Sequence, residues 1–320
     1  MTKRTRQTKH RAWRTSFLAV VRYELLWNIR KKKLLAVLIL AFTLATLTLV
    51  LPVVLNNLNN LPTPANPDYV INTGVGVGSF GFFLFALVSV MNTISGEFES
   101  GSILPLLTKP VSRTTVYLGK ITAAFLTILG AYVLLTIYLT VGGSLVYGPQ
   151  NNLYLVFVTL FGSLLSTMVW MGIVLAAGSV SKSSMLAALL GLGVFIGLSI
   201  VSGVVSVFSD QAWILTYLPG NGTTAALGSL PANQTGQPRN TISTGTDGIA
   251  MNLATYVLHP SDSVTFYRLD ILGRREVMPV ALYTEPLSLV VVRSIVVALV
   301  YIFVFNFIAW YALKRAQVAE

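Results

Sequence analysis

Six apolar segments, each long enough to cross a lipid bilayer, dominate this chain of 320 residues. A helix needs about 20 apolar residues to cross the hydrocarbon core, and it satisfies its own backbone hydrogen bonds where water is absent. Charged residues make up only 10% of the sequence, against about 25% in average soluble domains. We therefore expect an all-α integral membrane protein with six transmembrane helices. The expected spans are residues 34–55, 72–94, 121–146, 153–177, 185–208 and 287–313.

The Lys and Arg residues lie mainly on one side of these spans. With the N-terminus inside, 17 of the 22 fall on the inner side, eleven of them within residues 1–33, and four fall in the outer loops. Basic residues beside spans favour the cytoplasm, so we expect both termini inside. A secretory signal peptide fits the first span less well, because its charged region and its apolar run are both too long. The remaining Arg293 lies in the sixth span, where it is expected to reach outward or to pair with an acidic loop residue.

This topology divides the chain into four parts. They are a basic cytoplasmic arm with an interfacial helix (1–33), the first five spans with a cytoplasmic coupling loop at 95–120 (34–208), an extracellular loop (209–286), and the sixth span with a cytoplasmic tail (287–320). The extracellular loop is rich in turn-forming residues, and its Asn221 and Asn233 each match the acceptor pattern for N-glycosylation.

The basic arm carries a helical pattern just before the first span. Its apolar residues recur at spacings of three and four, namely Trp13, Phe17, Val20, Tyr23 and Trp27. Such a helix is expected to lie along the inner leaflet, with its aromatic side chains in the lipid and its arginines at the headgroups. Glu24 interrupts the apolar face, so it needs a partner from the basic cluster or a neighbouring subunit. A basic arm beside a span favours membrane lipid over nucleic acid as its partner.

No residue pattern predicts a catalytic, cofactor or metal site. Residues 76–81 spell G-x-G-x-x-G, but they lie inside an expected span, where glycines permit close packing, kinking or an unwound end. The nucleotide-binding pattern G-x-x-x-x-G-K-[ST] is absent, as is cysteine, and the two histidines, His10 and His259, are far apart. We therefore do not expect this chain to be an enzyme.

A polar island between the second and third expected spans carries a family pattern. Its residues are Glu97, Glu99, Gly101, Ser102 and Ile103, then Leu106, Leu107, Lys109, Pro110, Val111, Ser112 and Arg113, then Gly119 and Lys120. This island resembles the cytoplasmic loop of type-2 ABC exporter permeases. Glu24-Leu25, followed by Arg30 and a lysine run, is similar to the interfacial helix of that family.

The resemblance implies a permease subunit of the cell membrane that pairs with a second permease subunit, as a homo- or heterodimer. A separate ABC ATPase would use ATP, and this chain would bind no cofactor. The implied activity is export of a lipid-like, amphipathic or drug-like cargo. The implied ATPase-coupling residues are Glu97, Glu99, Gly101, Pro110, Arg113 and Lys120, and those of the interfacial helix are Trp13, Phe17, Glu24 and Trp27.

Each coupling residue has an expected physical role. The two carboxylates would meet a basic or polar cleft of the ATPase, Gly101 would turn the chain, and Pro110 would restrict the backbone. Arg113 and Lys120 would return the chain to the lipid surface. The alternatives are a non-transporting membrane anchor or assembly protein and, less favoured, a membrane enzyme, for which no catalytic constellation is found.

Overall fold

The structure, a computed structural model, describes residues 16–28, 30, 32–62, 65–101, 112–230, 240–270 and 278–315. In this part of the chain, six helical stretches are long and apolar enough to cross a membrane, which confirms the predicted number and the all-α membrane fold. They are α2 (Lys33–Leu58), α4 (Gly78–Val90) running on to α5 (Ser95–Glu99), α7 (Arg113–Tyr147), η1 (Leu153–Leu155) with α8 (Val156–Ser181), α9 (Ser184–Phe208) and α11 (Leu287–Arg315).

The second span begins later than predicted because its outer part is unwound. A short helix, α3 (Tyr69–Thr73), is followed by a turn in which Gly74, Gly76 and Gly78 have φ angles of 60°, 69° and 59°. These left-handed backbone conformations favour glycine over residues with a side chain. Of the outcomes expected for these glycines, the unwound end is observed, and so is close packing, because a Cβ at Gly76 would lie 2.6 Å from Leu139.

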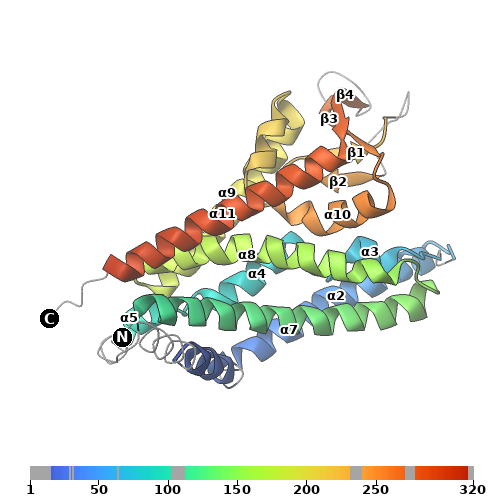
Figure 1. Cartoon of the computed structure of the whole chain (residues 1–320). Coiled ribbons are helices and arrows are strands. Elements are labelled where there is room, and N and C mark those ends of the chain that lie inside the picture. Colours follow the sequence, from blue (N-terminus) through green and yellow to red (C-terminus); the bar gives the residue numbers. More distant parts are fainter. Residues whose placement is uncertain are drawn as a thin grey trace, which may run out of the picture.

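Helix α8 lies in the middle of the bundle, between α11 and α7 in Figure 1. About 78% of its apolar, membrane-spanning stretch is buried inside the protein, against 6% for the corresponding stretch of α9. Small and hydroxyl-bearing residues allow close approach of neighbouring helices in a membrane. One such residue, Thr167, exchanges a 2.6 Å hydrogen bond with Tyr132 of α7. The packing of the whole bundle therefore depends on the surface of α8.

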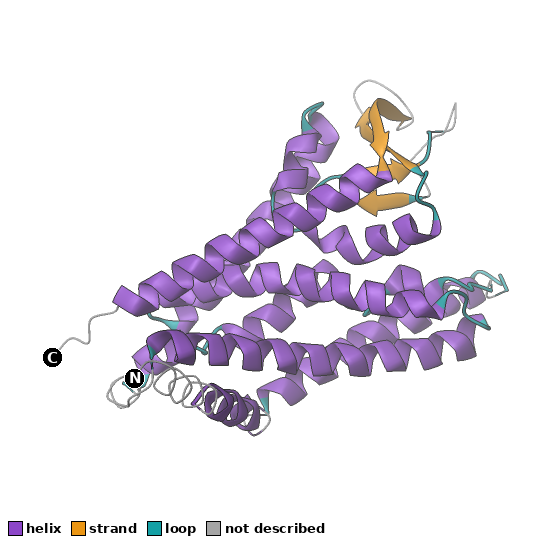
Figure 2. Cartoon of the chain, in the orientation of Figure 1, coloured by secondary structure: helices purple, strands orange, loops and turns teal. Residues whose placement is uncertain are grey.

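Residues 209–286, expected to be a turn-rich loop, contain a small folded unit (Figure 2). Its four strands are all antiparallel in the order β2-β1-β3-β4. The elements of the unit are η2 (Ala212–Tyr217), β1 (Thr224–Leu227), β2 (Thr241–Ser243), η3 (Thr246–Gly248), α10 (Ile249–Leu258), β3 (Ser263–Asp270) and β4 (Met278–Pro286). The buried side chains of Val264 and Phe266 pack with the start of α11, which gives the sheet a core of its own.

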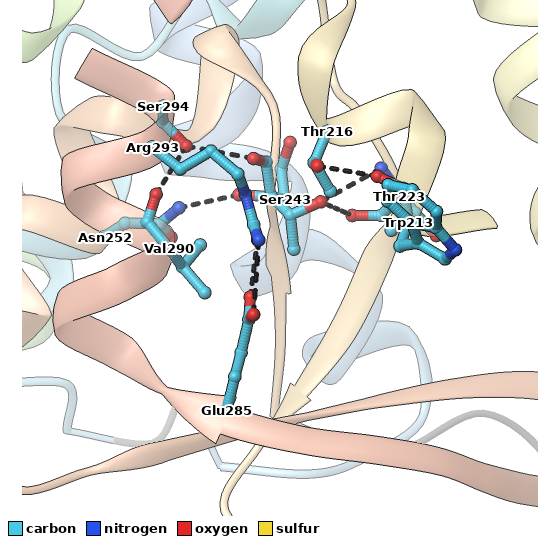
Figure 3. A network of polar contacts seen from close by, with 10 residues as sticks. Trp213, Thr216, Thr223, Ser243, Asn252, Glu285, Val290, Arg293 and Ser294 are labelled. Atoms are coloured by element: carbon cyan, nitrogen blue, oxygen red, sulfur yellow. Dashed lines mark hydrogen bonds and ion pairs between the residues drawn. The ribbon is translucent and has the colours of Figure 1, made fainter. Parts of the chain in front are cut away.

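Polar contacts attach this unit to the first turns of α11, as Figure 3 shows. Ser294 of α11 donates to the carbonyl of Thr244 at 2.9 Å. Within the unit, Asn252 of α10 donates to the carbonyl of Ser243 at 2.7 Å. Arg293 forms a bidentate pair with Glu285 of β4, at 2.5 and 3.2 Å. The expectation that Arg293 pairs with an acidic residue of the loop is thus confirmed.

Replacement of Gly162 by alanine is expected to loosen the contact between α8 and α10. A Cβ atom at Gly162 would lie 2.4 Å from Ala250 Cα and 2.6 Å from its nitrogen, so a backbone must shift. Overpacking of this kind costs about 1–3 kcal/mol, and the melting temperature of the purified protein in detergent should fall. Gly193→Ala is the matched control, because a Cβ there meets no atom within 4 Å. Equal melting temperatures for the two variants would show that this close contact is absent.

Candidate functional site

The polar island predicted from the sequence meets the N-terminal helical segment (residues 16–28) at one buried lysine. Lys120 of α7 extends its ammonium group to Glu24 at 2.5 Å and to Glu97 of α5 at 2.7 Å. The side chain of Lys120 is 5% exposed, while Glu24 is 13% and Glu97 is 21% exposed. One cation therefore links three segments that are distant in the sequence.

These contacts differ from two of the expectations stated above. Glu24 finds its partner in Lys120 rather than in the basic cluster or a neighbouring subunit. Lys120 is buried, so it does not reach the lipid surface. The physical reason is that a buried carboxylate requires an opposite charge close by, and Lys120 lies on the face of α7 that packs against residues 16–28.

The second acidic residue of the island, Glu99, binds the start of α9. Its Oε1 accepts the backbone N–H of Ser184 at 2.6 Å, and its Oε2 accepts the Ser184 hydroxyl. The first N–H groups of a helix have no partner within the helix and carry partial positive charge. The carboxylate of Glu99 therefore stabilises α9 and joins the end of the second span to the start of the fifth.

Arg113 joins the start of α7 to the end of α11. Its Nη1 donates to the carbonyl of Lys314 at 2.8 Å, and Trp310 donates its indole N–H to Thr114 at 3.2 Å. A guanidinium group is favourable at the last carbonyls of a helix, where partial negative charge collects. Four of the six spans, α4–α5, α7, α9 and α11, are thus fastened together at this end of the bundle.

A groove of about 800 Å³ opens between the N-terminal helical segment, the end of the second span and α7. Its charged lining residues are Glu24, Glu97, Glu99 and Lys120, so the carboxylates outnumber the single ammonium group. Trp27 and Tyr23 stack with ring centroids 6.1 Å apart, and both also line the groove. The lining suits a basic side chain that can stack on an aromatic ring.

The structure places the remaining predicted residues as follows. Gly101 has a φ angle of 66°, as a turn requires, and Phe17 is half-buried. A Cβ at Gly119 would lie 2.7 Å from Val20, so the N-terminal helical segment packs closely on α7 there. The side-chain amide of Asn221 forms a 2.5 Å hydrogen bond with the hydroxyl of Ser79. Trp13, Pro110 and Asn233 lie outside the described residues.

Two residues with polar roles were missed by the sequence prediction. Ser184 follows Ser183 directly before an apolar run, which is a recognisable helix-start signal. Asp247 lies in the segment expected to be a turn-rich loop, but it is only 9% exposed and accepts hydrogen bonds from Ser79 and Trp170. No local pattern marks it, because its donors come from α4 and α8, far away in the sequence.

Replacement of Lys120 by methionine is expected to destabilise the protein strongly. It would leave Glu24 and Glu97 facing each other without a cation, and breaking a buried ion pair in this way costs about 3–5 kcal/mol. Glu24→Gln should destabilise the protein less, because the ion pair between Lys120 and Glu97 remains. Lys120→Arg keeps a cation between the two carboxylates and should lose much less stability than Lys120→Met. Melting temperatures of the three variants test this order, and a fully stable Lys120→Met would contradict it.

Comparison with known families gives one result. The family model described as "ABC-2 family transporter protein" matches residues 18–318, so the match includes the N-terminal helical segment, all six spans and the sheet-containing unit. No curated protein matches the chain.

Proposed function

Because the chain belongs to the ABC-2 family of transporter proteins, we propose that it is a permease subunit that exports cargo across the cell membrane, driven by a separate ABC ATPase. The observation that carries this proposal is the family match over residues 18–318 of a chain with six membrane-spanning helices. The sequence contains no Walker A motif of its own, so powered transport needs a partner that hydrolyses ATP. The proposed cargo is lipid-like, amphipathic or drug-like.

The proposed contact with the ATPase is the segment from Glu97 to Arg113. Glu97 is held by Lys120, Glu99 by the start of α9, and Arg113 by the end of α11. A displacement of this segment would act on three spans through direct polar contacts, and on residues 16–28 through Lys120. The acidic groove beside it would receive basic side chains of the ATPase. Pro110, within the segment, would limit its freedom.

The proposed orientation places this end of the bundle in the cytoplasm, where ATP is available, with both termini inside and the sheet-containing unit outside. The distribution of Lys and Arg supports this assignment. We also propose a second permease subunit, identical or related. Helix α9 leaves apolar surface for such a partner and for lipid, because only 6% of its membrane-spanning stretch is buried inside the protein.

Single cysteines test the proposed orientation without background, because the chain has no cysteine of its own. Ser100→Cys should react with a membrane-impermeant maleimide only after the cells are made permeable. Leu61→Cys, at an exposed position after the first span, should react in intact cells. Labelling of Ser100→Cys in intact cells would contradict the proposed topology.

A photoreactive benzoylphenylalanine in place of Ser100 is expected to crosslink the chain to its ATPase. Mass spectrometry should identify a protein with a Walker A motif, and the same group at Leu61 should not capture it. In the protein that carries benzoylphenylalanine at position 100, Glu99→Lys should reduce the crosslinking yield several-fold, because it reverses the charge. Glu99→Gln should retain more of the crosslinking yield.

If the Ser100 position captures no ATPase in cells that express one from a neighbouring gene, the coupling assignment is wrong. A chain that also purified without any ATPase in mild detergent would instead fit a membrane anchor.

A further inference from the structure

A cavity of about 400 Å³ lies at the opposite end of the bundle, between α8, α9 and the sheet-containing unit. Its size falls within the range of about 300–1,000 Å³ that is usual for sites binding small molecules. The residues that give its chemistry are Trp170, Phe195, Ser202, Asn221, Ser243 and Asp247. None of the described residues that line it is Lys, Arg or His.

Asp247 is the one carboxylate among the described lining residues, and it is held in place by neutral donors. Its Oδ1 accepts the indole N–H of Trp170 at 3.1 Å and the hydroxyl of Thr246 at 3.4 Å. Its Oδ2 accepts the hydroxyl of Ser79 at 2.6 Å. A nearby cation strongly stabilises a buried carboxylate. None of the described residues that line the cavity supplies a cation.

Ser79 links Asp247 to Asn221. Its Oγ lies 2.6 Å from Asp247 Oδ2 and 2.5 Å from the side-chain amide of Asn221. The single hydroxyl hydrogen goes to the Asp247 carboxylate, and the amide of Asn221, turned so that its NH2 group faces Ser79, donates to the hydroxyl oxygen. All of these donors are neutral, so the positive charge that would balance Asp247 is missing from the described residues that line the cavity. A primary ammonium group would supply that charge together with three N–H donors.

The wall contributed by α9 also offers acceptors. Ser199 donates to the carbonyl of Phe195 at 2.8 Å, Ser206 donates to that of Gly203 at 3.0 Å, and Ser202 donates to that of Gly222. Their hydroxyl hydrogens are used within the protein, so their oxygen lone pairs remain for a ligand.

An aromatic wall completes the cavity. The rings of Trp170 and Phe195 meet edge to face with centroids 5.2 Å apart. Aromatic faces attract organic cations.

We propose that this cavity binds the primary ammonium group of an organic amine, with Asp247 as its counter-ion and the Trp170 and Phe195 rings beside it. Both a free amine and the ethanolamine headgroup of a lipid carry this group. The site is a property of the chain alone, so its test does not depend on the ATPase of the proposed function.

The pH dependence of binding follows from Asp247. Burial raises the pKa of this carboxyl from 3.8 to about 6, opposed by the donors Ser79, Trp170 and Thr246. Those three do not titrate, and Tyr132 of α7 is the neighbouring phenol that interacts electrostatically with Asp247. The carboxylate is therefore ionised at pH 7 and protonated as the pH falls below 6. A cation that binds only the ionised form should bind about tenfold more weakly at pH 5 than at pH 7.5.

The test uses the full chain in nanodiscs of phosphatidylglycerol and isothermal titration calorimetry with benzylammonium. We expect measurable binding that weakens about tenfold from pH 7.5 to pH 5, while neutral benzyl alcohol binds at least tenfold more weakly. Asp247→Asn should lose at least tenfold in affinity, and Asp262→Asn, a carboxylate outside the cavity, should lose none. Absence of benzylammonium binding, equal binding of the alcohol or unchanged affinity in Asp247→Asn would each overturn the proposal.

A second variant guards against misfolding of Asp247→Asn. Gly203 lines the cavity and a Cβ there meets no atom within 4 Å, so Gly203→Leu should fold and fill the site. Retained binding in a folded Gly203→Leu protein would contradict the assigned cavity. A lower apparent affinity in nanodiscs that contain phosphatidylethanolamine would identify the lipid headgroup as an occupant, and unchanged affinity would identify the free amine.

Discussion

A charge buried within the protein must find its partner there, because it is shielded from water, and this requirement organises the two ends of the bundle. At one end Lys120 is enclosed by Glu24 and Glu97. At the other end Arg293 is paired with Glu285. Each pair joins a membrane-spanning helix to a segment outside the spans. The N-terminal helical segment is held in this way at one end, and the sheet-containing unit is held at the other.

The number of spans could be predicted from the sequence, because length and apolar composition suffice to identify a membrane helix. The pairing of Arg293 with an acidic residue was also predictable, since a lone arginine near the end of a span has few choices. The partners of Lys120 were not, because counting basic residues assigns a side of the membrane and says nothing about contacts between helices. The sheet was missed for a similar reason. Val264 and Phe266 alternate with other residues as a strand requires, but this signal is short and turn-forming residues surround it.

Helix α8 provides the physical connection between the two ends. Near its start, Gly162 allows the backbone of α10 to approach, and Ser166 donates to the carbonyl of Thr246 at 2.7 Å. Near its end, a Cβ at Gly178 would lie 3.2 Å from Ala187 and 3.4 Å from Ser95, so α9 and the start of α5 pack closely there. One buried helix therefore contacts both the sheet-containing unit and the start of α5, which leads into the segment proposed to meet the ATPase. Close packing of this kind transmits displacement, since well-packed interiors have low compressibility.

The two ends differ in how their carboxylates are balanced, and the difference agrees with the two roles proposed above, coupling to an ATPase at one end and cation binding at the other. Glu24 and Glu97 share an ammonium group of the protein itself, so their charge is largely satisfied before any partner arrives. Asp247 has neutral donors and no basic residue among the described residues of its cavity. Its burial opposes ionisation at neutral pH, and an external cation would relieve that cost. The carboxylate is held by hydrogen bonds from Ser79 of α4 and Trp170 of α8, and these donors leave its charge without a counter-ion. Its position beside an aromatic wall, at the end of the helix that reaches the other side of the bundle, is better suited to sensing what occupies the cavity.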